Sequence, residues 1–189
     1  MRCLWLLACV ILSTEILAVP PFESTPDEAR MCEQRVYARK DPNNHDWTHM
    51  HHYCDCLRFY DRAVANHADP YSVKYNIGIS VGGCDYVLRH TSAEFKMRPE
   101  VLVIRGRSLE LSGNGVEGAN SYNEALKLDP NFSMAYGALG NFYVKTGDKR
   151  QALKIYQEGL RRNPSNRYLR ARYQAIGGET DSNRGQTGQ

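Results

Sequence analysis

The second half of the chain repeats its own sequence at an interval of 34 residues. At this offset Tyr122 aligns with Tyr156, and Pro130 aligns with Pro164. A fixed period of this length is typical of proteins that stack several copies of one small unit, in which each copy packs only against its neighbours. The repeat therefore predicts an elongated stack of similar units in place of one globular centre.

Each copy combines small and large residues in a way that suits two closely packed helices. In the second copy Gly140 and Ala152 are small where antiparallel helices would approach each other. Tyr136, Leu139 and Tyr143 are large enough to fill the space between the helices. Small residues that face large ones fix the crossing of the two helices.

Turn signals set the ends of the expected helices. The segment 146–148 has the sequence Thr-Gly-Asp, in which glycine readily adopts the left-handed conformation and aspartate caps the following helix. Pro130 and Pro164 end the second helix of each copy, because proline disfavours helix at the residue before it. We expect five helices in this half of the chain, at 99–112, 115–128, 133–146, 149–162 and 165–176.

The two copies, residues 99–132 and 133–166, resemble the tetratricopeptide repeat (TPR) family. The second copy carries the whole family pattern, whereas Arg105 and Gly118 are the weaker fits in the first copy. The resemblance implies an all-α fold, a short right-handed TPR solenoid of antiparallel helix pairs with a C-terminal capping helix at 167–176. The residues that carry the pattern are Gly106, Tyr122, Ala125, Pro130, Tyr136, Leu139, Gly140, Tyr143, Ala152, Tyr156, Gly159 and Pro164.

The family resemblance also implies a function, the binding of a peptide or helix of a partner protein in a concave groove lined by the first helix of each pair. Only Asn141 matches the Lys- and Asn-rich clamp with which some members hold a C-terminal carboxylate. Arg107, Asn141 and Arg172 suit a peptide of some acidic character, or else they only solvate this face. The expected groove residues are Val103, Arg107, Glu110, Met134, Asn141, Lys145, Tyr168 and Arg172.

Two repeats are fewer than the roughly three that a stable stack needs, so the preceding segment should contribute helices. We expect residues 45–98 to form a divergent helical hairpin, a possible degenerate repeat, with helices at 46–67 and 74–91. The connection at 67–72 is longer than the turns of the regular copies. Residues 19–44 are expected to form a largely irregular N-terminal extension.

The start of the chain has the pattern of an export signal. Leu4 to Leu12 form a continuous apolar run of signal-peptide length that is too short to span a bilayer as a helix. We expect a signal peptide at 1–18 and an exported, periplasmic or secreted protein, without stable membrane insertion after cleavage. The tail at 177–189 has no large apolar residue and is expected to be disordered. The region between resembles exported bacterial TPR proteins at 52–54, 84–88 and 97–100.

Four cysteines follow the expected signal peptide, and an oxidising compartment would join them in two disulfides. Four cysteines allow three pairings, among which spacing alone does not choose. The expected hairpin favours Cys56 with Cys84, because these residues would lie on facing helices near the positions where the two helices of the regular copy meet. Cys32 would then pair with Cys54 and tie the N-terminal extension to the same helix.

The segment 45–56 carries the densest group of potential metal ligands. On a helix, His45 and His49 share a face, as do His49 and His52, and this spacing is typical of zinc or copper ligands. The alternative is that the histidines pack or face solvent while both nearby cysteines are oxidised, since a disulfide sulfur does not bind zinc. We favour the alternative and expect no metal and no other cofactor.

No catalytic motif is present in the sequence. It lacks a Gly-x-Ser-x-Gly elbow, a phosphate-binding glycine loop that ends in Lys-Ser or Lys-Thr, and His-Glu-x-x-His. The 24 basic and 21 acidic residues give a formal charge of +3, which is well below that of a typical nucleic-acid-binding protein. We therefore expect no enzyme and no nucleic-acid partner, but a scaffold or adaptor that binds another protein in the cell envelope.

Overall fold

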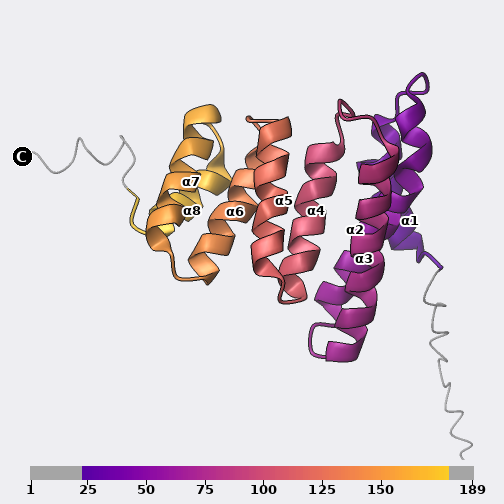
Figure 1. Cartoon of the computed structure of the whole chain (residues 1–189), viewed down its shortest axis with the longest axis horizontal. Coiled ribbons are helices and arrows are strands. Elements are labelled where there is room, and N and C mark those ends of the chain that lie inside the picture. The colour runs from indigo at the N-terminus through magenta and orange to yellow at the C-terminus, as the bar shows by residue number, and fades with distance from the viewer. Residues whose placement is uncertain (1–22, 179–189) are drawn as a thin grey trace, which may run out of the picture.

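The structure, a computed structural model, describes residues 23–178 of the chain and is entirely helical over these residues. The helices follow one another in a row from the N-terminal to the C-terminal end (Figure 1). The α-helices are α1 (Pro26–Arg35), α2 (Met50–Ala65), α3 (Pro70–His90), α4 (Arg98–Leu111), α5 (Gly115–Leu128), α6 (Ser133–Lys145), α7 (Lys149–Arg162) and α8 (Arg167–Ala175). Two short 3-10 helices, η1 (Tyr37–Arg39) and η2 (His45–His49), precede α2.

The helices pack as consecutive antiparallel pairs. α2 packs on α3, α4 on α5 and α6 on α7, and the second helix of each pair also contacts the first helix that follows it. The first helices α2, α4, α6 and α8 contact one another in chain order, whereas within the described residues α3 does not contact α5 and α5 does not contact α7. The first helices therefore form one continuous surface, which we call the first-helix face. This arrangement confirms the all-α solenoid of helix pairs with a capping helix.

Glycine allows the two helices of each regular pair to approach closely. α4 and α5 meet at Gly106 and Gly118, where a Cβ built on Gly118 would lie 2.6 Å from the carbonyl oxygen of Gly106. In the next pair, Gly140 packs directly against the ring of Tyr156. Gly118, a weak fit to the family pattern, is thus a contact point between the two helices. Ten of the twelve pattern residues are buried or half-buried: Gly106, Tyr122, Ala125, Tyr136, Leu139, Gly140, Tyr143, Ala152, Tyr156 and Gly159.

The five helices expected from residue 99 onward are present, with ends within two residues of the expected positions. The turn at 146–148 has the expected chemistry, since Gly147 has φ 81° and the Asp148 side chain accepts a hydrogen bond from the backbone N–H of Gln151. Both α5 and α7 end just before a proline, at Leu128 and Arg162.

The segment before residue 99 differs from the expectation in three places. Of the segment 19–44 expected to be largely irregular, the described residues 23–44 contain α1 and η1, and α1 begins with a capping box in which Thr25 and Glu28 each accept a hydrogen bond from the other's backbone N–H. α3 begins at Pro70 instead of 74, since Asp69 caps the helix and proline suits its first position, so the connection is short. The helix expected from 46 begins only at Met50, after η2.

Two expected segments lie at the ends of the chain. The expected signal peptide at 1–18 lies outside the described residues, as does the expected tail from 179 onward. Within residues 23–178, no helix has both the length and the apolar character needed to cross a bilayer.

Candidate functional site

The first-helix face carries a row of polar side chains that links consecutive helices. Between α4 and α6, the Lys145 Nζ lies 2.9 Å from the Glu110 Oε2. The other oxygen of Glu110 accepts a hydrogen bond from the Tyr122 hydroxyl of α5. Burial, and then this hydrogen bond to a carboxylate, raise the pKa of Tyr122 well above its ordinary value. Tyr122 therefore remains a neutral donor that holds Glu110 in place.

A second polar link joins α6 to the capping helix α8. The Asn141 Nδ2 donates to the Tyr168 hydroxyl at 2.7 Å, and the Asn141 Oδ1 accepts from the Tyr156 hydroxyl at 2.8 Å. Burial raises the pKa of Tyr156 to about 12. The Arg172 guanidinium lies 5.2 Å from the centre of the Tyr168 ring, within the range of a cation–π contact. Asn141 is thus oriented by two tyrosines and is not a free clamp residue.

Arg107 of α4 lies on the same face toward α2. It is close enough to Tyr60 of α2 for its positive charge to oppose the rise that burial causes in the Tyr60 pKa. Arg107 is half-buried, and no carboxylate of the described residues lies within ion-pair distance of its guanidinium. Arg107, Lys145 and Arg172 therefore place positive charge on three successive first helices.

Two expected groove residues have a different environment. Val103 is fully buried, at 0% exposure, in a core cluster with Leu102 and Leu139, so it cannot contact a ligand on the surface. This cluster joins residues of α4, α5 and α6, so the packing of these helices buries Val103. Met134 is half-buried and packs against the same cluster. The exposed part of the expected site is therefore polar.

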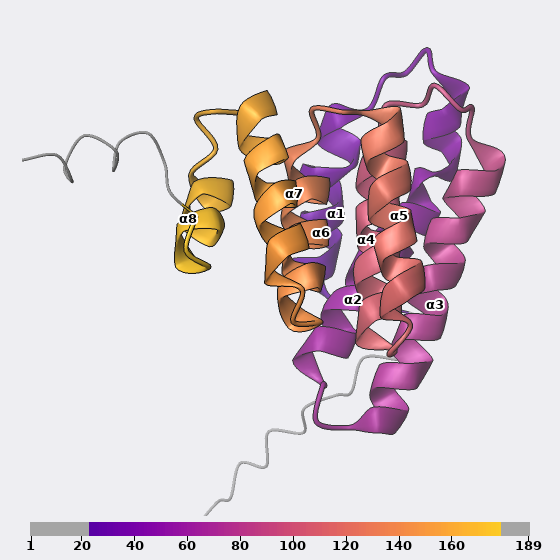
Figure 2. The ribbon, with the colours of Figure 1, turned by 60° about the vertical axis from the view of Figure 1, so that its left-hand side comes forward.

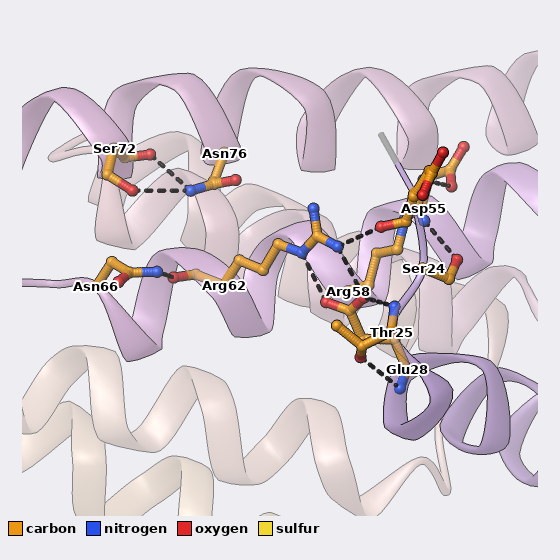
Figure 3. A network of polar contacts seen from close by, with 10 residues as sticks. Ser24, Thr25, Glu28, Asp55, Arg58, Arg62, Asn66, Ser72 and Asn76 are labelled. Carbon is orange, nitrogen blue, oxygen red and sulfur yellow. Dashed lines mark hydrogen bonds and ion pairs between the residues drawn. The ribbon is translucent and has the colours of Figure 1, made fainter. Parts of the chain in front are cut away.

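The N-terminal segment covers part of the first-helix face, which sequence reasoning missed. The Nε and Nη2 of Arg62 on α2 donate to the two carboxylate oxygens of Glu28, at 2.6 and 2.7 Å (Figure 3). Beside this pair, the Arg58 guanidinium donates to the Ser24 hydroxyl. The capping box at Thr25 and Glu28 was the available sequence signal for a helix here.

The same segment also reaches α4. The Arg39 Nη1 lies 2.7 Å from the Oε2 of Glu100, whose other carboxylate oxygen accepts a hydrogen bond from the buried Tyr53 hydroxyl at 3.0 Å. α1 lies on the side of the stack away from α5 and α7 (Figure 2). The chain's own N-terminal segment thus lies over α2 and reaches the start of α4 through Arg39, and it leaves the rest of the first-helix face over α4, α6 and α8 uncovered.

The comparison with protein families agrees with this architecture. Residues 121–154, which run from α5 through α6 into α7, match the family model described as tetratricopeptide repeat. Residues 121–154 are thus similar to a tetratricopeptide repeat. Among solved structures, it is similar to the Sgt2 TPR domain from Aspergillus fumigatus at 17% identity and a TM-score of 0.49, covering 65% of this chain and 76% of that chain. No curated protein matches the sequence.

Two disulfides tie the helices α1, α2 and α3 together. Cys56 and Cys84 join α2 to α3 with their Cα atoms 5.3 Å apart, and Cys32 and Cys54 join α1 to α2 at 5.5 Å. Gly83 lies next to Cys84, and a Cβ at Gly83 would be 2.6 Å from the carbonyl oxygen of His52. The close approach of α2 and α3 therefore coincides with the disulfide.

The histidines of segment 45–56 stack with rings from α3. The His52 ring lies 3.8 Å from the Tyr86 ring, which lies 3.9 Å from His90, and His49 lies 5.5 Å from His90. His45 packs 5.9 Å from His49. Within residues 23–178, no group of three or more His, Cys, Asp or Glu side chains is arranged to hold a metal ion. Cys54 and Cys56 are both oxidised, so neither offers a thiolate to a metal.

Proposed function

We propose that this TPR protein is an exported, non-enzymatic scaffold or adaptor that binds a peptide or helix of a partner protein on its open first-helix face. TPR domains are protein-protein interaction modules, and the observation that carries the proposal is the polar row on α4, α6 and α8. The side chains of this row are held by hydrogen bonds with neighbouring tyrosines and by an ion pair, so a partner would lose little free energy to ordering them on binding.

The charge of the row favours a partner segment of acidic character. Arg107 and Arg172 have no ion-pair partner among the described residues, and Lys145 is 69% exposed although it contacts Glu110. Tyr168, which is 48% exposed, supplies an aromatic surface beside Arg172. An aromatic ring flanked by arginine is a common centre of protein-protein recognition.

Export is supported by two features of this chain. The apolar run that begins at Leu4 has the length of a signal peptide, and the four cysteines of the described residues are paired in disulfides, which persist in oxidising compartments. A cell-envelope location, periplasmic or secreted, is consistent with both features.

The experiment that tests the proposal is selection of peptides from a random display library on the immobilised protein. We expect enrichment of peptides with Asp and Glu. Arg107→Glu with Arg172→Glu should abolish the binding of the enriched peptides, whereas Lys74→Glu with Arg89→Glu on α3 makes the same change in net charge away from this face and should leave it unchanged. Equal binding by both double variants would refute the site.

A further inference from the structure

The charge of this chain is divided unevenly along the solenoid. Residues 23–144 contain 13 basic and 16 acidic side chains, a formal charge of −3. Residues 145–178 contain nine basic and two acidic side chains, a formal charge of +7. The formal charge of +3 of the whole chain thus combines a mildly acidic body, a strongly basic C-terminal end and a charge of −1 from the remaining residues.

The basic residues of the two parts differ in their surroundings. In the body, Arg58 is buried, and Arg62, Arg98 and Arg105 are half-buried and make hydrogen bonds or ion pairs within the fold. All nine basic residues of the C-terminal end are exposed. The fold does not depend on these nine cations as it depends on the buried and half-buried arginines of the body, because neither the end of a helix nor a capping helix needs so many cations.

Two of the exposed cations share one carboxylate. Arg161 and Arg162 both pair with Glu158, and hydrogen bonds from Arg161 and Arg162 lower the pKa of Glu158 to about 2. Lys145 and Arg172 belong to the first-helix face described above. Five further cations make no ion pair with any residue that the structure describes: Lys149, Arg150, Lys154, Arg167 and Arg170.

These five side chains, which we call the basic end, are spread over the outside of α7 and over α8. Arg150 and Lys154 are four residues apart on α7, and Arg167 and Arg170 are three residues apart on α8, so each pair shares a helix face. Most of the exposed large apolar side chains lie away from the basic end. The two exceptions are Val144, just before α7, and Tyr168, which contacts Asn141 on the first-helix face. None of these five cations lies over an aromatic ring of the described residues, and the apolar surface beside them comprises Tyr168 and a hollow at Lys149 that Val144, Ala175 and Ile176 also line.

The excess of charge over apolar surface decides which partner fits. Specific protein interfaces are centred on buried aromatic or arginine anchors in pockets, and single-stranded nucleic acid is bound by basic grooves with aromatic rings on which bases stack. Exposed Lys and Arg that are not stacked on such rings suit a diffuse anionic surface, to which each contributes about 1 kcal/mol through Coulomb attraction alone.

We propose that the basic end docks this protein onto the anionic phospholipid surface of a membrane, with the solenoid projecting from it. The proposal rests on the proposed export only in that an envelope protein meets such a surface. It uses none of the side chains assigned to partner binding, so the two sites are separable. Docking would leave the first-helix face free to hold a partner protein near the membrane.

The test is sedimentation of the purified protein with vesicles of phosphatidylcholine and phosphatidylglycerol, and with vesicles of phosphatidylcholine alone. We expect binding to the anionic vesicles in about 50 mM NaCl. In about 500 mM NaCl we expect this binding to be lost, because salt at that concentration screens the attraction between the exposed cations and the lipid phosphates. Arg150→Glu, Lys154→Glu and Arg167→Glu together should weaken binding by roughly 100-fold.

The matched control carries Lys74→Glu, Arg89→Glu and Lys127→Glu, which remove three exposed cations from the body of the solenoid. Its vesicle binding should change by less than about threefold, since these residues lie away from the docking surface. Equal losses in the two triple variants, equal binding to uncharged vesicles, or binding of duplex DNA in place of vesicles would each overturn the proposal. Peptide binding by the first-helix face should survive the basic-end variant, so failure of one site leaves the other standing.

Discussion

Gly118→Ala should destabilise this protein, although alanine is the better helix former. In an unhindered helix interior the change stabilises by about 0.5–1 kcal/mol, because glycine loses more backbone freedom on folding. At Gly118 the new Cβ would lie 2.6 Å from the carbonyl oxygen of Gly106, whereas a carbon atom contacts an oxygen at about 3.3 Å or more. The obstacle is backbone on the facing helix, which cannot rotate away.

The helices α4 and α5 must therefore move apart by roughly 0.7 Å at this point. Overpacking of this kind costs about 1–3 kcal/mol, and the better propensity of alanine offsets only part of it. We expect a net loss of about 0.5–2 kcal/mol in the free energy of unfolding. In a domain of this size that loss lowers the melting temperature by roughly 2–6 °C.

Gly78→Ala on α3 is the matched control, because Gly78 is exposed and an added Cβ would meet no atom within 4 Å. This change should raise the free energy of unfolding by about 0.5–1 kcal/mol. Urea unfolding of both variants, followed by circular dichroism, measures the difference. The reasoning is refuted if Gly118→Ala is as stable as Gly78→Ala, since the close approach of α4 and α5 would then not exist in solution.

Three further predictions concern the divergent hairpin. Replacing Cys32 and Cys54 by serine opens a loop with a sequence separation of 22 residues, which should cost about 3 kcal/mol of stability and speed hydrogen exchange in α1. Arg62→Met removes the bidentate contact to Glu28 and should expose the N-terminal segment to limited proteolysis, whereas Lys74→Met should not. Burial and then the neighbouring His51 lower the pKa of His52, so the unfolded chain binds a proton at this histidine more readily than the folded chain. The free energy of unfolding should therefore fall as the pH drops below 6.5. This fall should be smaller in His52→Gln.

The regular part of the fold could be predicted from the sequence because every local signal there agrees. The proline at each repeat end, the Thr-Gly-Asp turn and the contrast between Gly140 and Tyr156 all favour the same helix pair. The hairpin before it has no second copy for comparison. Pro70 of this hairpin fits either a connection or the first position of a helix. Because the Asp69 side chain caps the helix, this proline starts α3.

The candidate site was predictable only in part, because its residues depend on contacts between elements far apart in the chain. The family resemblance predicted that Glu110 and Lys145 share one groove, and the structure pairs them as an ion pair. It could not show that the packing of α4 with α5 and α6 buries Val103. Nor could it show that the N-terminal segment lies over α2, since this placement depends on pairs such as Arg39 with Glu100, separated by 61 residues.

The net charge illustrates the same limit for function. A formal charge of +3 argues against a polyanionic partner only if the charges are evenly mixed, because electrostatic attraction depends on the local field within about 10 Å at physiological salt. In a solenoid the sequence order is also the spatial order, so a cluster of cations in the last 34 described residues remains a cluster in space. A body of −3 and an end of +7 therefore act as two separate surfaces, and the expectation about anionic partners must be derived for each surface in turn.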